Sequence, residues 1–252
     1  MRQSGSVKGR TWIVISGNVL YDIRKEKEEK RYLMIRNYSK RVFGCIVSLA
    51  LFGFGSFLGV KAGSAGTNAW NTLSLGMQDQ LGISFGTATL LVSGLIIVID
   101  LLGKGKVGVG SILNVLLIPF FSDLFLNLLA FVPAASEPLP GALLSLAGQT
   151  VVSFATVFYM LPALGCGPRD TLMILVGKRF PKVPIGTFKF AIEAVALLAG
   201  ALMGAPVGLG TVLVMVLQAS IFQLVCRVLR YEPRNVHHED IMETWRALNV
   251  AR

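Results

Sequence analysis

A lysine and a glutamate lie one helical turn apart in an apolar stretch near the C-terminal end of the chain. Lys189 precedes Glu193 by four residues, which places both on one face of a helix, where they can pair. In a membrane-spanning helix each such charge would cost about 2.5–3.5 kcal/mol near the centre. Two interpretations stay open. Lys189 extends to the cytoplasmic boundary and neutralises Glu193, or Glu193 binds a proton, a cation or a solute.

A second apolar stretch contains Asp123 with Asn114 and Asn127. Asp123 and Asn127, four residues apart, share a helix face, whereas Asn114 lies nine residues before Asp123 and does not. Such groups either form hydrogen bonds between helices or contact a solute, and both remain open. Asp100, close to Lys104 at the end of its own apolar stretch, is expected at the membrane boundary, and Gln218 is expected to make an interhelical hydrogen bond.

Two loops place glycines and a polar residue ahead of a brief apolar run. Asn71 and Asp170, the latter next to Arg169, are the predicted N-caps of two short helices. An exposed helix N-terminus has unpaired N–H groups and partial positive charge, which suit an anion or a polar solute. The alternative is a pair of helices that only cover the surface of the bundle. The candidate solute-binding or ion-binding residues are therefore Glu193, Lys189, Asp123, Asn114, Asn71, Arg169 and Asp170.

Other kinds of chemistry are poorly represented. Cys45, Cys166 and Cys226 are far apart and have no metal-ligand spacing, and both histidines, His237 and His238, lie in a polar terminal segment. Neither a nucleophile–base pair nor a metal cluster can be assembled from these residues. The sequence predicts no enzyme activity, no cofactor and no metal site.

The composition predicts an integral membrane protein. Hydrophobic residues make up 53% of the 252 residues and charged residues 15%. Between residues 42 and 226 there are only eight bases and six acids. A soluble surface normally carries charge on about a quarter of its residues, so this stretch cannot cover a soluble domain. The net charge of +10 is therefore attributed to membrane topology and not to nucleic-acid binding.

Six stretches are long enough, or nearly so, to cross a hydrocarbon layer of about 30 Å. They run approximately over residues 42–60, 86–102, 109–132, 141–164, 185–203 and 207–226. With the N-terminus inside, the cytoplasmic segments hold 22 bases and the outer loops only Lys61. This distribution predicts that both termini face the cytoplasm, in a bacterial cytoplasmic membrane.

The chain resembles itself at an offset of about 100 residues. The segment 83–87 aligns with 183–187, 107–111 with 207–211, and 69–73 with 168–172. Each unit has three spans, and an odd number of crossings makes the two units inverted. We predict an all-α polytopic bundle of six transmembrane helices, built as two inverted three-helix repeats with short intervening helices. Its parts are a basic tail (1–41, with Met34 a candidate alternative start), repeat 1 (42–133), repeat 2 (141–228) and a polar C-terminal tail (229–252).

Gly55, Gly59 and Gly63 recur every four residues on the first span. This spacing is typical of close helix packing. The partner helix lies either in the same bundle or in a second protomer, so a homo-oligomer is one of the two arrangements.

The segments 165–170 (Gly-Cys-Gly-Pro-Arg-Asp), 186–193 and 207–211, with Trp70 and 108–114 in the first unit, resemble the YczE/YitT-type bacterial integral membrane proteins. The likeness is closest to the YczE-like branch and covers about residues 40–230. It departs at Ala69 and Asn71, where Pro-Trp-Asp is typical. The resemblance implies a multi-span bacterial membrane protein and no defined activity.

The leading functional hypothesis is passage of a small solute or ion across the membrane. Besides the lipid bilayer, the expected partner is an unidentified small solute or ion, and no nucleic acid. Two alternatives stay open: a non-transporting adaptor for assembly or regulation, and a substrate-capturing subunit of a larger transporter. A transporter is expected to lose activity on Glu193→Gln, whereas an adaptor is expected to fail when Gly55 or Gly59 becomes large.

Overall fold

The computed structural model describes residues 3–7, 10–14, 20–180, 182, 185–231, 239–243 and 245. Side chains are described from Tyr38 onward, except at 173, 174, 177, 178, 185 and 186 within the helices. Val183, Pro184, His237 and His238, to which the sequence predictions refer, lie outside the described residues.

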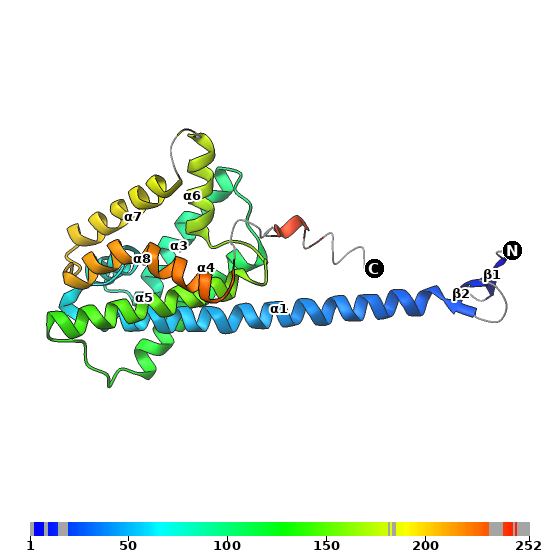
Figure 1. Cartoon of the computed structure of the whole chain (residues 1–252), viewed down its shortest axis with the longest axis horizontal. Helices are drawn as coiled ribbons and strands as arrows, with labels where there is room; N and C mark the ends of the chain where they lie inside the picture. The colour runs from blue at the N-terminus through cyan, green and yellow to red at the C-terminus, as the bar shows by residue number, and fades with distance from the viewer. Residues whose placement is uncertain are drawn as a thin grey trace.

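The described chain forms a helical bundle preceded by a small sheet (Figure 1). The sheet is antiparallel, in the order β1-β2-β3, and lies at the far end of the long helix α1. Residues 1–41, predicted as a tail, thus contain this sheet and the first turns of α1. The elements are β1 (Gln3–Val7), β2 (Arg10–Val14), β3 (Leu20–Asp22), α1 (Ile23–Val60), the 3-10 helix η1 (Gly63–Ala65), α2 (Ala69–Leu81), α3 (Phe85–Leu102), α4 (Val109–Leu128), α5 (Pro138–Met160), α6 (Pro168–Arg179), α7 (Ile185–Leu202) and α8 (Leu209–Val228).

Five described helices are long and apolar enough to cross a membrane: the part Tyr38–Val60 of α1, and all of α3, α4, α5 and α8. The predicted multi-pass helical membrane bundle is thereby confirmed. The predicted span after Pro184 corresponds to α7, which contains Lys189 and Glu193 and is not among these five. The count of six spans stays a prediction.

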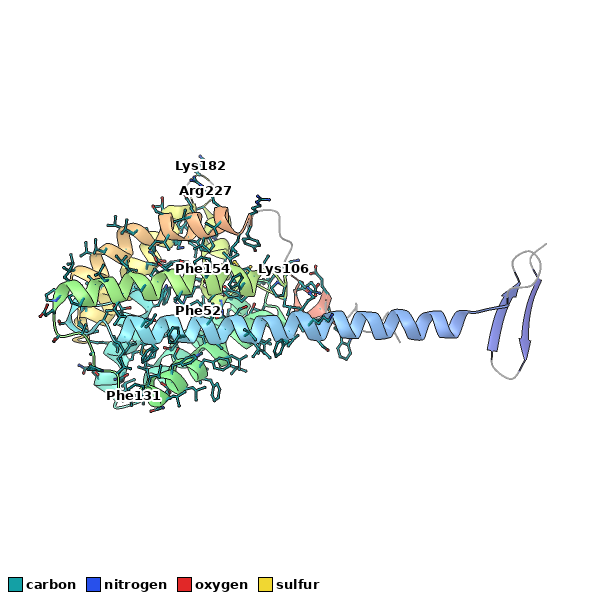
Figure 2. The ribbon with its side chains drawn as sticks, turned by 60° about the horizontal axis from the view of Figure 1, so that its bottom comes forward. Phe52, Lys106, Phe131, Phe154, Lys182 and Arg227 are labelled. Carbon is teal, nitrogen blue, oxygen red and sulfur yellow. The ribbon has the colours of Figure 1, made fainter. Side chains whose placement is uncertain are left out.

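Helices α1 and α5 pack side by side along the bundle, with Phe52 on one and Phe154 on the other (Figure 2). Glycines permit this approach. A Cβ atom at Gly55 would lie 2.8 Å from Cγ2 of Val152 and 2.9 Å from the carbonyl oxygen of Gly148. Helix α4 packs against α1, and α8 packs against α5.

The two short helices pack across the bundle. Helix α2 contacts α7 more extensively than it contacts α3, and α6 contacts α3 more extensively than it contacts α7. Each short helix therefore lies mainly against a helix from the other half of the chain. This exchange brings the first turns of α2 and α6 toward the same central space.

The loops that lead into the short helices are held in a matching way. The amide N–H of Gly110, at the start of α4, donates to the carbonyl oxygen of Leu164 at 2.8 Å, and the Ser111 hydroxyl donates to the carbonyl oxygen of Cys166 at 2.5 Å. In the other half, Gly66 pairs with Val207 just before α8 in an isolated antiparallel bridge. Gly66 has a φ of +74°, which favours glycine. Each loop before a short helix is thus fixed to the start of the last helix of the other half.

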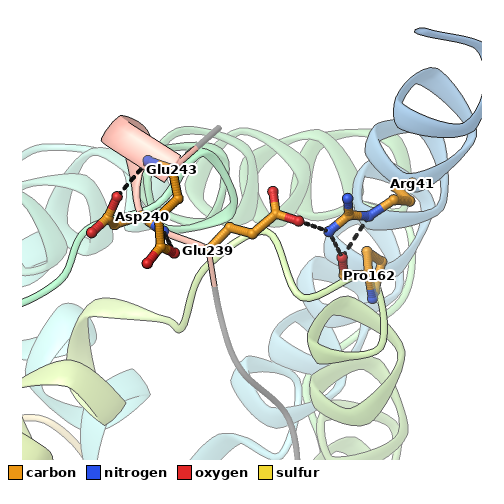
Figure 3. A network of polar contacts seen from close by, with 5 residues as sticks. All are labelled: Arg41, Pro162, Glu239, Asp240 and Glu243. Carbon is orange, nitrogen blue, oxygen red and sulfur yellow. Dashed lines mark hydrogen bonds and ion pairs between the residues drawn. The ribbon is translucent and has the colours of Figure 1, made fainter. Parts of the chain in front are cut away.

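A C-terminal segment, residues 239–243, docks on the end of the bundle (Figure 3). Arg41 donates to the carbonyl oxygen of Pro162 and, at 2.8 Å, to Oε1 of Glu239. The Glu239 and Ile241 amides donate to the carbonyl oxygens of Ala163 and Val107. The predicted polar tail therefore includes a segment that covers the turns after α3 and α5.

Candidate functional site

A cavity of about 410 Å³ lies inside the bundle, between the first turns of α2 and α6. Its apolar wall comes from α1, α4, α5, α7 and α8 and includes Phe52, Ile118, Met160, Ile192 and Phe222. Six of the seven predicted solute-binding residues line it: Glu193, Lys189, Asn114, Asn71, Arg169 and Asp170. The volume falls in the range of small-molecule sites, about 300–1,000 Å³.

Helix α2 begins one turn earlier than predicted. Its N-cap is Asn68, whose side chain accepts a hydrogen bond from the Asn71 amide at 3.0 Å. The prediction that Asn71 is the N-cap is wrong. Asn68 also has a short polar side chain, and it lies three residues before Asn71, which is the usual spacing between an N-cap side chain and the backbone amide that donates to it. Asn71 instead lies buried in the first turn, where its Nδ2 is 3.5 Å from the carbonyl oxygen of Ser56 and 3.5 Å from Oγ1 of Thr67.

Helix α6 also begins before the predicted residue. Gly167 is its N-cap and Pro168 its first residue, so the prediction that Asp170 is the N-cap is wrong. Proline is favoured at this position because its fixed φ suits a helix and its missing N–H would have no partner there. Asp170 lies within the first turn and accepts a hydrogen bond from the Tyr159 hydroxyl at 3.2 Å.

Arg169 and Trp70 meet inside the cavity. The guanidinium carbon of Arg169 lies 4.4 Å from the centre of the Trp70 ring, within the range of a cation–π contact. Trp70 belongs to the first turn of α2 and Arg169 to the first turn of α6. This contact therefore joins the two short helices directly.

Glu193 is buried, with 8% of its surface exposed, and accepts a hydrogen bond from Nε2 of Gln218 on α8. This confirms the interhelical hydrogen bond predicted for Gln218. The predicted pairing with Lys189 is not found: both side chains line the cavity, but no ion pair joins them in the described structure. Gln218 lies on the neighbouring helix α8 within hydrogen-bond distance of Glu193, whereas the Lys189 side chain is exposed.

Asn114 and Asp123 have different surroundings although both belong to α4. Asn114 is buried at the cavity beside Gly167. Asp123 lies away from the cavity and caps α3, accepting hydrogen bonds from the Ser84 hydroxyl at 2.5 Å and from the Gly86 amide at 2.6 Å. Of the two interpretations of Asp123, the structure shows the contact between helices.

The predicted glycine stripe contacts the same chain at all three positions, with Gly55 and Gly59 on α1 and Gly63 at the start of η1. Gly55 lies against α5, and a Cβ atom at Gly59 would lie 2.5 Å from Oγ1 of Thr67 and 3.0 Å from Nδ2 of Asn71. Gly63, with a φ of +60°, lies against the carbonyl oxygen of Ala135. Gly59 thus allows the loop before α2 to reach the cavity.

Several cavity residues were not singled out from the sequence as site residues. Trp70 contributes its ring, and Gln149, Ser153 and Tyr159 contribute polar atoms from α5. The available signal was the recurrence of polar residues at positions 149, 153 and 156 in an apolar span, which places them on one helix face. Within the described residues, no group of three or more His, Cys, Asp or Glu side chains is arranged to hold a metal ion.

Known proteins are similar to this chain over the region that forms the helical bundle. Residues 39–227 match a family of unknown function, DUF6198. An uncharacterized protein of Haemophilus influenzae is 30% identical over 188 residues, which is 75% of this chain and 84% of the relative. The uncharacterized membrane protein YczE of Bacillus subtilis is 26% identical over 176 residues, which is 69% of this chain and 80% of YczE. No solved structure matches the chain.

The matched region runs from the start of the apolar part of α1 to the end of α8 and contains every residue of the cavity. The resemblance to the YczE-like branch, based on the glycine-rich loops and the short helices, is confirmed. This chain is a multi-pass membrane protein and belongs to the DUF6198 family of unknown function.

Proposed function

We propose that the protein binds a small polar solute in the central cavity and allows it to cross the membrane. One observation carries the proposal: the first turns of two short helices from different halves of the chain meet at a cavity that contains a buried carboxylate, Glu193. Buried charges within a bundle are costly, and in membrane proteins they mark solute and ion pathways.

The arrangement of the helices supports two inverted repeats. In this scheme the first half comprises α1, α2, α3 and α4, which correspond in order to α5, α6, α7 and α8 of the second half. The contacts follow the same correspondence: α1 packs against α4 as α5 packs against α8, and α2 packs against α7 as α6 packs against α3. Transporters built from inverted repeats bind their solute at the interface of the repeats, next to broken or short helices. Moving one half against the other would then open the cavity to each side in turn.

The charge distribution supports an orientation in the cytoplasmic membrane with both termini inside. The end of the bundle that carries Arg41, Lys106 and the docked segment 239–243 would face the cytoplasm. The loop that leads into α6 lies at this end, and the loop that leads into α2 lies at the other.

The test is solute flux in proteoliposomes that contain the purified full-length protein. Vesicles are incubated with a mixture of amino acids, organic acids, amines, sugars, vitamins and inorganic ions, and the internal composition is measured by mass spectrometry over time. Wild-type protein is expected to speed the equilibration of at least one solute over protein-free vesicles. Glu193→Gln is expected to slow that flux by about tenfold or more, which corresponds to about 1.4 kcal/mol.

The matched control is Glu137→Gln, which makes the same change at an exposed loop position outside the cavity. It is expected to retain wild-type flux. The proposal of transport through this cavity is contradicted if no solute equilibrates faster with wild-type protein, or if Glu193→Gln transports as well as wild type. Either result would favour the adaptor hypothesis.

A further inference from the structure

Within the part of the chain that the structure describes, the guanidinium group of Arg169 has a ring on its face and no hydrogen-bond acceptor at its edge. Trp70 stacks against it, and among the described residues no side chain or carbonyl oxygen accepts a hydrogen bond from it. Arginine has five N–H donors in one plane, and a ring on the face leaves the edge free. A forked edge of this kind matches the two oxygens of a carboxylate.

The carboxylates nearby already have neutral donors. Tyr159 donates to Oδ2 of Asp170, and Gln218 donates to Oε2 of Glu193. Both acids act electrostatically on Arg169 without bonding to it. The edge of Arg169 is therefore available to an anionic group that comes from outside the chain.

The N-termini of α2 and α6 also favour an anionic group in the cavity. The N-cap residues of α2 and α6, Asn68 and Gly167, both line the cavity. Helix N-termini carry partial positive charge and favour carboxylates. Arg169 lies in the first turn of α6 and contacts the first turn of α2, so all three contributions act on one part of the cavity.

The formal charges of the cavity cancel. Arg169 and Lys189 are cations, and Asp170 and Glu193 are anions. A ligand with one charge only would leave an uncompensated charge in the cavity, whereas a zwitterion would not. Gln218 engages one oxygen of Glu193, and the other oxygen, Oε1, can accept a hydrogen bond from an ammonium group.

We propose that the cavity binds an α-amino acid with an apolar side chain. Its carboxylate would bind the edge of Arg169, its ammonium group Glu193, and its side chain the wall formed by Phe52, Ile118 and Phe222. This inference rests on the same cavity as the proposed function and names the class of solute that it would bind.

The test uses tryptophan fluorescence of the full-length protein in detergent. The chain has three tryptophans, and the changes Trp12→Phe and Trp245→Phe leave Trp70 as the only one. The probes are leucine, isocaproate, which lacks the amine, and isoamylamine, which lacks the carboxylate. Phenylalanine, hydrocinnamate and phenethylamine form a second set of three.

Leucine or phenylalanine is expected to change the Trp70 emission in a saturable way, and both analogues in its set are expected to bind at least about thirtyfold more weakly. Arg169→Gln in this background is expected to weaken amino-acid binding by a similar factor. Arg179→Gln makes the same change at an exposed position on the same helix and is expected to have no effect. Arg169→Lys keeps the charge without the fork and is expected to bind weakly while still eluting as a monodisperse protein.

The inference is overturned if neither amino acid gives a saturable change, if isocaproate or hydrocinnamate binds as tightly as its amino acid, or if Arg169→Gln binds normally. Flux separates this result from the proposed function. Tight amino-acid binding without flux contradicts transport alone, whereas flux of a sugar or an inorganic ion without amino-acid binding contradicts the inference alone.

Discussion

The guanidinium carbon of Arg169 lies 4.4 Å from the centre of the Trp70 ring, and the two residues occupy matching positions in the similar segments 69–73 and 168–172. Each residue is the second of its short helix. The predicted inverted repeats would place a contact between matching residues on the axis that relates the two halves. The contact connects the two short helices at the cavity.

Replacement of Trp70 tests this contact. Trp70→Ala removes the ring and is expected to weaken binding of a cavity ligand by about 0.5–2 kcal/mol, which is about two- to thirtyfold in the dissociation constant. Trp70→Phe keeps a smaller ring and is expected to have an intermediate effect. Isothermal titration calorimetry measures both. Trp245→Phe, at an exposed position beyond the docked segment 239–243, is the control. Equal affinities for wild type and Trp70→Ala would contradict the role of the stack.

Gly55 is expected to be sensitive to the addition of a single methyl group. Gly55→Ala places a Cβ atom 2.8 Å from Val152 and 2.9 Å from the Gly148 carbonyl oxygen, so the α1–α5 pair must separate. Overpacking of this kind typically costs about 1–3 kcal/mol. A lower midpoint of thermal unfolding in detergent is therefore expected.

Gly44→Ala is the matched control, because it makes the same change on the same helix where no atom lies within 4 Å of the added Cβ. It is expected to leave the midpoint unchanged or to raise it, since alanine favours a helix over glycine by about 1 kcal/mol. Equal midpoints for the two variants would show that α1 and α5 do not pack at Gly55.

Asp123 is expected to affect stability more than flux. Asp123→Ala removes the acceptor of the Ser84 hydroxyl and of the Gly86 amide at the N-terminus of α3. Hydrogen bonds to a charged group contribute about 1.5–3 kcal/mol, so the midpoint of thermal unfolding should fall. Asn127→Ala, an exposed position one turn later, is the control. Loss of flux at an unchanged midpoint would instead favour a solute contact at Asp123.

Asp100 is buried more deeply than its place beside Lys104 predicted. Its side chain is 0% exposed, and among the described residues neither carboxylate oxygen has a hydrogen-bond partner. Burial of a charged or unsatisfied polar group costs free energy, so Asp100→Asn, which removes the charge at constant shape, is expected to stabilise the fold by about 1–3 kcal/mol. Thermal unfolding measures the gain.

The control for Asp100 is Asp79→Asn, at an exposed position on α2, which is expected to change little. A fall in the unfolding midpoint of Asp100→Asn would show that the carboxylate has a stabilising partner, and would contradict this account of its burial.

The sequence by itself determined the membrane bundle, the loops that precede two short helices and the four charged residues that line the cavity. These conclusions depend on local properties. The apolar length of a segment decides whether it can cross a bilayer, and glycines with a polar residue ahead of an apolar run mark the start of a helix. Glu193, Arg169 and Asp170 could be identified because a charge near an apolar span is unusual wherever the span packs.

The tertiary structure decided which side chains meet. Glu193 accepts a hydrogen bond from Gln218 and forms no ion pair with Lys189 in the described structure. Asp123 accepts a hydrogen bond from the amide of Gly86, which lies 37 residues earlier in the chain, and Arg169 stacks on Trp70. Each of these contacts depends on how two helices are rotated and offset against each other. That rotation follows from the sum of many packing contacts, such as the approach of α1 and α5 at Gly55, and not from the local sequence of either helix.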